Sequence, residues 1–191
     1  ATLFAKDYGF QNYYGSYEEL VADPKLEIVY IASPHSLHYE HTMLCLRNGK
    51  HVICEKAFAL NAKEVKEMIR EARKRNLFLM EALWPPFQPF YMKAHEIIKS
   101  GILGKINYLD GYFSFIPPFD PNDRKFNLAL GGGSLMDIGI YPVIDALTFL
   151  GLPAGIKAAA VFGQTGSEES LSVIFTYPDG KMASLYSSFR T

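Results

Sequence analysis

Residues 51–82 read HVICEKAFALNAKEVKEMIREARKRNLFLMEA, and this stretch decides the fold. The apolar runs at its two ends, 51–54 and 77–82, have the composition of strands that are buried on both faces. Between them, residues 62–75 place apolar side chains along one stripe and charged side chains opposite, as an amphipathic helix does. Asn61 is predicted to cap the start of this helix and Asn76 to close it. A strand, a helix and a strand in this order predict a right-handed βαβ unit of a parallel sheet.

The same alternation of helix and strand continues upstream. Ser16 and Glu19 form a capping box at the start of a short helix, because the two residues can satisfy each other's free backbone amides. Residues 27–32 have the pattern of another buried strand, and 37–47 that of another helix. Residues 1–84 therefore predict an α/β domain built on a parallel sheet.

The pattern changes after Trp84. One more helix, at about 87–100, is followed by long segments in which apolar and polar residues alternate with a period of two, at 105–116, 155–163 and 171–190. This period is typical of antiparallel strands. A single helix near 134–150 interrupts them. Residues 85–191 therefore predict an α+β domain with a large, mostly antiparallel sheet and helices on one face.

The composition is that of a folded globular protein. The 191 residues carry a net charge of −1, and 49% are hydrophobic and 20% charged, which argues against a disordered chain. Such a chain has no long-range attraction for nucleic acid or anionic lipid, and no apolar run approaches the roughly 20 residues of a membrane span. Cys45 and Cys54 lie in apolar segments, so we expect buried free thiols and a cytoplasmic location.

Polar side chains follow each predicted strand of the first domain. The carboxyl ends of parallel strands meet at one edge of a sheet, and ligands bind there. Glu55 and Lys56 come directly after a buried strand, where charged side chains rarely lie without a partner. Each segment alone could be ordinary polar surface, but together they predict a binding site. The residues concerned are Ser33, Pro34, His35, His38, Glu55, Lys56 and Trp84.

A second cluster lies in the run GGGSLMDIGIYPVID at 131–145. Asp137, Tyr141 and Asp145 recur every four residues, so a helix would place them on one face. The same spacing fits a capped structural helix equally well. The three glycines permit close approach of the backbone to a ligand or to a neighbouring loop, and Pro142 should kink or restart the helix.

A metal site is the weaker interpretation of the histidines at 35, 38 and 41. Zinc sites do use histidine and cysteine, and Cys45 follows at helical spacing. The segment lacks paired Cys-x-x-Cys or His-Glu-x-x-His spacing, however, and its helix must bury one face in any case. No metal is predicted, and His41 and Cys45 are interpreted as packing residues.

Both clusters resemble the signatures of one family. Residues 54–57, Cys-Glu-Lys-Ala, resemble the Glu-Lys-Pro motif of the glucose–fructose oxidoreductase and inositol dehydrogenase (Gfo/Idh/MocA) family. The run 131–145 resembles its second signature, glycines followed by Asp-x-Gly-x-(His or Tyr)-x-x-x-Asp. Tyrosine at 141, rather than histidine, is similar to glucose–fructose oxidoreductase and to the dimeric dihydrodiol dehydrogenases, and Glu-Ala-Leu-Trp at 81–84 also resembles the dihydrodiol dehydrogenase branch. The resemblance covers essentially the whole chain.

The resemblance implies a Rossmann-type first domain and hydride transfer between NAD or NADP and a carbinol of a sugar, polyol or dihydrodiol. Tyr141 would be the general acid/base, Lys56 would contact the nicotinamide ribose and the substrate hydroxyl, and Asp137 would orient the substrate or the lysine. A phenol alone titrates near pH 10, and a nearby ammonium group favours the phenolate. The cofactor groove would be lined by Ser33, Pro34, His35, His38, Glu55, Lys56 and Trp84.

The resemblance also sets expectations beyond the site. Ala57 replaces the usual proline of the motif, and Pro86 stands where close relatives often carry arginine. A first βαβ unit with Gly-x-Gly-x-x-Gly is expected upstream of Ala1, and family proteins continue beyond Thr191. Because family members dimerise through the second sheet, a homodimer or a larger even-numbered oligomer is expected.

A second class of function shares this fold. A non-catalytic protein that senses a dinucleotide or a sugar would have the same architecture, and fold alone does not separate the two. A sensor is free to lose catalytic residues. The presence of Lys56, Asp137 and Tyr141 together therefore favours the enzyme.

Overall fold

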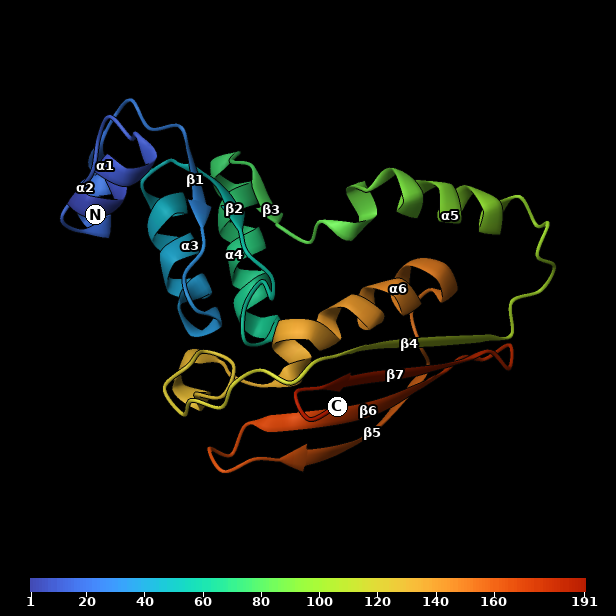
Figure 1. Ribbon diagram of the computed structural model, residues 1–191. Helices are drawn as coiled ribbons and strands as arrows, with labels where there is room; N and C mark the ends of the chain where they lie inside the picture. Colours follow the sequence, from blue (N-terminus) through green and yellow to red (C-terminus); the bar gives the residue numbers. More distant parts are fainter. The chain divides into compact units, whose positions relative to one another are not determined.

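The computed structural model describes all residues from 1 to 191. The chain forms two compact units, Ala1–Ala82 and Leu83–Thr191. The division places Trp84 in the second unit, whereas the sequence pattern set it at the end of the first. Each unit is built around its own sheet (Figure 1).

The first unit has a parallel sheet of three strands in the order β1-β2-β3. Helices α3 and α4 pack against each other and lie along this sheet (Figure 1). The predicted alternation of helix and strand is thus confirmed. The elements are α1 (Thr2–Tyr8), α2 (Tyr17–Ala22), β1 (Ile28–Ile31), the 3₁₀ turn η1 (His35–Leu37), α3 (His38–Arg47), β2 (His51–Cys54), α4 (Ala62–Arg75) and β3 (Leu79–Glu81).

Side chains predicted to cap helices do so. The backbone amide of Glu19 donates to Ser16 Oγ at the start of α2, and the amide of Glu64 donates to Asn61 Oδ1 at the start of α4. Asn76 ends α4 in the left-handed conformation, at a φ of 55°. The sequence did not predict α1, which has no side-chain cap at its beginning.

The core of the first unit lies between the helices and the sheet. Leu46, Val52, Cys54 and Met68 have no exposed surface. Burial of each large side chain contributes roughly 1.5–3 kcal/mol of hydrophobic free energy. The cysteines are free and buried, as predicted, and burial raises the pKa of the Cys54 thiol to about 12.

The second unit has a four-stranded sheet in the order β4-β7-β6-β5. β5 pairs with β6 and β6 with β7 in antiparallel fashion, as the sequence predicted, while β4 and β7 run parallel. The elements are η2 (Pro85–Phe87), α5 (Pro89–Lys99), β4 (Tyr108–Ser114), η3 (Leu128–Leu130), the π-helix η4 (Leu135–Gly139), α6 (Ile140–Leu150), β5 (Gly155–Phe162), β6 (Glu168–Thr176) and β7 (Met182–Ser188).

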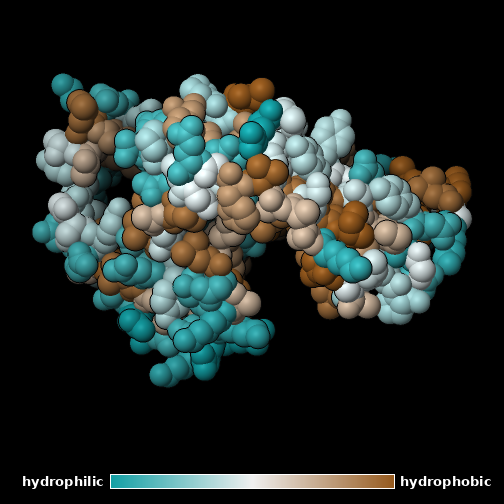
Figure 2. Space-filling view, turned by 90° about the horizontal axis from the view of Figure 1, so that it is seen from below, coloured by the Kyte–Doolittle hydropathy of each residue, from teal (hydrophilic) through white to brown (hydrophobic).

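Helix α6 covers one face of this sheet (Figure 1). Every second residue of β6 and β7 faces the helix and is buried, which follows from the period of a strand. The strand β5 at the edge exposes most of its residues. In the space-filling view, hydrophobic residues reach the surface among hydrophilic ones (Figure 2). The buried set is Ala146, Leu150, Leu171, Val173, Phe175, Tyr177, Ala183 and Leu185.

One helical stretch, Leu128–Leu150, is long and apolar enough by length and composition to cross a membrane. The apolar runs of the sequence did not indicate this, because charged residues and glycines divide them. Nearly half of the most apolar part of the stretch is buried inside the protein, and Asp137 and Asp145 lie within it. The stretch has the properties of a core helix of the second unit.

Candidate active site

The carboxyl ends of the three parallel strands lie side by side in the first unit. Ile31 is in register with Cys54, and Cys54 with Glu81. The loops that follow β1 and β2 therefore leave the sheet at one edge. They carry the predicted cofactor residues of this unit, which are Ser33, Pro34, His35, His38, Glu55 and Lys56.

Glu55 has the partner that its position after a buried strand requires. Its Oε1 accepts a hydrogen bond from the hydroxyl of Tyr30 on β1. Its Oε2 accepts from the backbone amide of Lys56 at 3.2 Å. The hydrogen bond to Glu55 raises the pKa of Tyr30 to about 12, so the phenol remains the donor. The pair fixes the strand end from which Lys56 projects.

His38 lies beneath this edge and has no exposed surface. Its Nδ1 is 2.7 Å from the carbonyl oxygen of Ala57, and its Nε2 is 2.8 Å from the carbonyl oxygen of Ser33. The ring thus joins the loop after β1 to the loop after β2, and the buried His35 ring meets it edge-on. In this position His38 holds backbone rather than facing a ligand.

Glu81 at the end of β3 lies at the same edge of the sheet, and the sequence gave it no role in the site. Its Oε1 accepts a hydrogen bond of 2.9 Å from the backbone amide of Phe58 in the loop after β2. Burial raises the pKa of this carboxyl, while the bond to Phe58 opposes the shift. Glu81 therefore fixes the far side of the loop that carries Lys56.

Asp137 lies in the second unit, in the π-helix that precedes α6, and only 5% of its surface is exposed. Its Oδ1 is 2.8 Å from Nη1 of Arg124, a half-exposed side chain. The ion pair stabilises the charged carboxylate. The sequence gave no signal for Arg124, which lies thirteen positions before Asp137 in the chain.

The glycines at 132 and 133 are required by neighbouring protein groups. A Cβ at Gly132 would lie 2.9 Å from the backbone of Asn127. One at Gly133 would lie 1.9 Å from a carboxylate oxygen of Glu168, which accepts a hydrogen bond from the amide of Leu135. Of the two alternatives that the sequence left open, close approach to a neighbouring loop therefore explains these glycines.

Tyr141 occupies the first turn of α6, where the π-helix changes to an α-helix. The helix thus changes its geometry just before Pro142, where the sequence predicted a kink or a restart. Single π-helical turns often occur at functional sites. The hydroxyl oxygen of Tyr141 accepts a hydrogen bond of 3.3 Å from Nε1 of Trp84. The ring of Phe113 lies 5.6 Å from that of Tyr141.

These rings belong to a pocket of about 580 Å³ within the second unit. Its walls are mostly apolar and aromatic, as is usual for a site that binds a small organic molecule. The pocket is lined by Trp84, Pro85, Phe90, Tyr91, Ala94, Phe113, Tyr141, Asp145 and Phe149.

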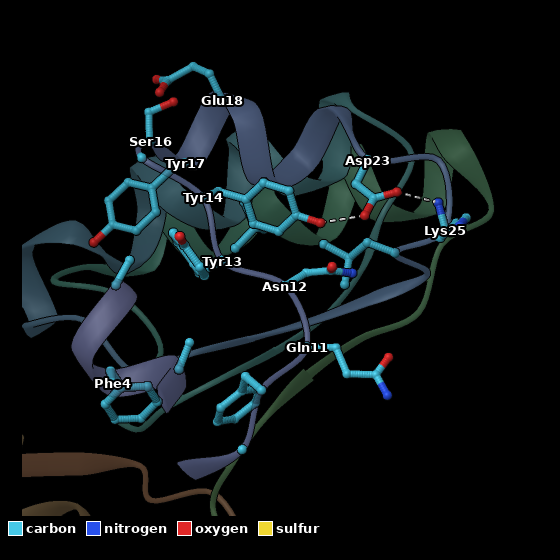
Figure 3. Close-up of a pocket in the computed structure, with 17 residues that line it drawn as sticks. Phe4, Gln11, Asn12, Tyr13, Tyr14, Ser16, Tyr17, Glu18, Asp23 and Lys25 are labelled. Carbon is cyan, nitrogen blue, oxygen red and sulfur yellow. Dashed lines mark hydrogen bonds between the residues drawn. The ribbon is translucent and has the colours of Figure 1, made fainter. Parts of the chain in front are cut away.

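A larger hollow, of about 1020 Å³, lies in the first unit among α1, α2 and the loop between them. Its labelled aromatic residues include Phe4, Tyr13 and Tyr17 (Figure 3). The hydroxyl of Tyr14 donates to Asp23, which also accepts from the amide of Lys25. No predicted site residue lines this hollow, so it is not the candidate site.

The histidines and acidic residues form no group that could hold a metal ion. His41 instead packs against Tyr17, with Nδ1 3.0 Å from Ser33 Oγ. Burial lowers the pKa of its imidazole. His41 is therefore a packing residue of α3.

Both parts of the chain match models of known protein families. Residues 1–83 match an oxidoreductase family with an NAD-binding Rossmann fold, and residues 91–191 match the GFO/IDH/MocA C-terminal domain. The two matches fall in the order in which the sequence signatures occur.

Individual relatives give the same result. Trans-1,2-dihydrobenzene-1,2-diol dehydrogenase of Xenopus laevis is 37% identical over 98% of this chain and 57% of its own length. The D-xylose 1-dehydrogenase (NADP(+)) of Hypocrea jecorina is 36% identical over 86% of this chain and 46% of its own length. The crystal structure of aldose-aldose oxidoreductase from Caulobacter crescentus, complexed with glycerol, superimposes with a TM-score of 0.89 at 29% identity. That match covers 98% of this chain and 59% of the enzyme.

The chain spans about half the length of the curated relatives that it matches. Within that span the resemblance seen in the sequence is confirmed by both family matches. The chain therefore belongs to the Gfo/Idh/MocA family of oxidoreductases.

Proposed function

We propose that the protein is an NAD- or NADP-dependent dehydrogenase that acts on a carbinol of a sugar, polyol or dihydrodiol. Lys56, Asp137 and Tyr141 are its proposed catalytic residues. The observation that carries the proposal is the position of Tyr141, a phenol at a π-helical turn that faces an aromatic pocket. Relatives named as dehydrogenases of a dihydrodiol and of D-xylose support the reaction type.

The residues at the edge of the first sheet suit a dinucleotide. A parallel sheet binds such ligands beyond the carboxyl ends of its strands, and here these ends are fixed by Tyr30, His38 and Glu81. In this proposal Ser33, Pro34, His35 and Glu55 line the groove, and His38 supports it from beneath. The dinucleotide, when bound, supplies or accepts the hydride.

The phenol of Tyr141 moves the proton of the reacting alcohol. Its oxygen accepts a hydrogen bond from Trp84, and a phenol can donate its own hydrogen as well as accept one. Lys56 would contribute a positive charge that favours the phenolate, which is the form of Tyr141 that takes the proton from the alcohol. Asp137, held by Arg124, orients the substrate hydroxyl or the lysine. Proton transfer by a positioned group of this kind is typically worth about a hundredfold to ten-thousandfold in rate.

The aromatic walls hold the carbon skeleton of the substrate. Trp84, Phe113 and Tyr141 present ring faces and edges to the pocket, with ring centroids 5.6–6.1 Å apart. Such surfaces bind the C–H face of a ring and keep water from the reacting carbon. A sensing protein could use the same walls. The presence of a proton-carrying phenol among them favours catalysis.

Three further properties are part of the proposal. The small-molecule substrate and the dinucleotide are the expected ligands, rather than nucleic acid or a membrane. We propose a cytoplasmic location, which accords with two free, buried cysteines. We also propose an even-numbered oligomer formed through the sheet of the second unit.

The test uses the full-length protein and a panel of sugars, inositols and dihydrodiols with NAD and NADP. On the best substrate, Tyr141→Phe should lower kcat by about a hundredfold to ten-thousandfold, because only the acid/base oxygen is removed. Its affinity for the dinucleotide, measured by cofactor fluorescence, should change little. Lys56→Met should lower both turnover and cofactor affinity.

Tyr8→Phe is the matched control, because it removes the hydroxyl of an exposed tyrosine in α1. It should turn over substrate at the wild-type rate. If Tyr141→Phe keeps more than half of the wild-type rate, Tyr141 is not the acid/base. Absence of binding of both NADH and NADPH at millimolar concentration would contradict the proposed function as a whole and favour a different role.

A further inference from the structure

Asp145 lines the same pocket as Tyr141, one helical turn further along α6. Four residues of α-helix rise by about 6 Å. The backbones of the two residues therefore lie about 6 Å apart along the helix axis, and both side chains line the pocket. The mechanism proposed above uses Tyr141 and leaves Asp145 without a role.

The carboxyl group of Asp145 is partly buried in apolar surroundings. Burial raises its pKa, and the hydroxyl of Tyr91 is the only group that opposes the shift. No lysine, arginine or histidine forms an ion pair with it, unlike Asp137 with its Arg124. A carboxyl group removed from water without a cation costs free energy, so it requires a partner or a function.

The elements that face Asp145 provide one more polar group, Tyr91 on α5. Its hydroxyl is buried and makes no hydrogen bond of regular geometry, although Asp145 and Thr148 lie close enough to affect its pKa. The ring of Tyr91 stacks on Phe149 at 5.1 Å, which fixes the phenol in place. This end of the pocket is therefore polar, although the surrounding walls are aromatic. The carboxyl group of Asp145 and the hydroxyl of Tyr91 can both form further hydrogen bonds there.

We propose that Asp145 accepts a hydrogen bond from a substrate hydroxyl that is remote from the reacting carbinol, so that the pocket selects a polyhydroxylated ring such as an aldopyranose. The proposal rests on the proposed function, because the reacting carbinol is assigned to Tyr141. Aromatic rings would bind the C–H face of the sugar, and the carboxylate would bind its far hydroxyl.

The need for a hydroxyl remote from the reacting carbinol separates the three substrate classes left open above. The two oxygens of a vicinal diol are neighbours on the ring, so a dihydrodiol has no hydroxyl remote from the reacting carbinol that could donate to Asp145. A sugar or a cyclic polyol carries hydroxyls on carbons further round the ring. Asp145 therefore favours these over a dihydrodiol.

A hydroxyl group fits this spot better than an ammonium group. A hydroxyl donates one hydrogen bond and accepts others, whereas an ammonium group can only donate. The carboxyl of Asp145 needs a donor, and the adjacent phenol of Tyr91 can donate to an acceptor. The raised pKa of Asp145 also weakens its attraction for a cation.

The experiment compares D-xylose with trans-1,2-cyclohexanediol as substrates of the full-length protein. Asp145→Leu should lower the ratio of kcat/KM for D-xylose to kcat/KM for the diol by about tenfold to a hundredfold, the usual worth of a hydrogen bond to a charged group. Asp145→Asn keeps an acceptor oxygen and should lower the ratio less. Asp110→Asn, an exposed carboxylate on β4, is the matched control.

Trp84 provides a second measurement that does not depend on turnover, because it is the only tryptophan among these 191 residues and it lines the pocket. D-xylose should change the tryptophan fluorescence of the wild-type protein, and Asp145→Leu should weaken this binding by a similar factor. Binding of this kind without turnover of any alcohol would support the site while contradicting the proposed function.

Two results would overturn the proposal. The first is an unchanged ratio for Asp145→Leu together with unchanged xylose binding, in a variant whose circular dichroism and melting temperature match the wild type. The second is stronger binding of a 3-amino-3-deoxy sugar than of its hydroxyl parent, lost in Asp145→Leu. That result would assign the site to a cation.

Discussion

Replacing His38 by leucine tests how the edge of the first sheet is held together. Leucine fills a volume similar to that of the ring and preserves the apolar contacts of a fully buried side chain. It cannot donate a hydrogen bond. The carbonyl oxygens of Ala57 and Ser33, now 2.7 and 2.8 Å from the ring nitrogens, would both lose their partner.

The expected loss of stability follows from these two oxygens. A buried polar group without a partner costs about 1–3 kcal/mol. Ala57 is buried and would bear that cost, whereas Ser33 is partly exposed and can bind water instead. We expect a loss of about 1–3 kcal/mol in the free energy of unfolding.

The measurement is urea unfolding of the full-length protein followed by circular dichroism, with fluorescence titration of NADPH alongside. His41→Leu is the matched control, because His41 lies on the same helix and contacts only the side-chain hydroxyl of Ser33. It should cost less than about 1 kcal/mol. If the two variants lose equal stability, or if His38→Leu binds NADPH as tightly as the wild type, His38 does not fix the two loops.

The remaining predictions concern pH and assembly. Burial raises the pKa of Glu81 in the folded protein above the ordinary carboxyl pKa. The protonated carboxyl group therefore stabilises the fold at a pH below the ordinary pKa, and this stabilisation is lost as the pH rises through the pKa of the folded state. Glu81→Gln keeps an acceptor for Phe58, and its melting temperature relative to the wild type should rise as the pH increases above the ordinary carboxyl pKa of about 4; a constant difference would contradict this. The uncovered sheet face predicts an even-numbered oligomer in sedimentation at micromolar concentration, which Ile174→Lys should dissociate. A wild-type monomer would refute the proposed interface.

The local pattern of the sequence was sufficient for the regular elements. The stripe of residues in α4 and its caps, Asn61 and Asn76, predicted the helix at 62–75 because these interactions act within a few residues. The strand at 51–54 was predicted to the residue for the same reason. In contrast, α1 has neither a capping side chain nor a clear stripe, so its sequence gave no signal.

The contacts that shape the site could not be predicted, because they join residues far apart in the chain. Glu81 meets Phe58 across 23 positions, and Glu168 meets Leu135 across 33. The sequence indicated that the glycines at 132 and 133 allow another group to approach the backbone closely. It did not indicate that this group belongs to the protein rather than to a ligand. It identified His38 as a ligand contact, whereas the structure shows its ring bound to backbone.

The parallel pairing of β4 with β7 affects how the second unit folds. Tyr108 is in register with Met182, 74 residues later. The first strand of this sheet therefore cannot pair until the last strand has been synthesised. Pairing at such long range is slow, because the conformational entropy of a large loop is lost before any contact between the strands stabilises the pair. During synthesis β4 would leave the ribosome with one edge unsatisfied and remain vulnerable to aggregation until β7 follows. Truncation anywhere before Ser188 should therefore leave helix α6 packed on an incomplete sheet. We expect such a truncated protein to be degraded by proteases faster than the intact one.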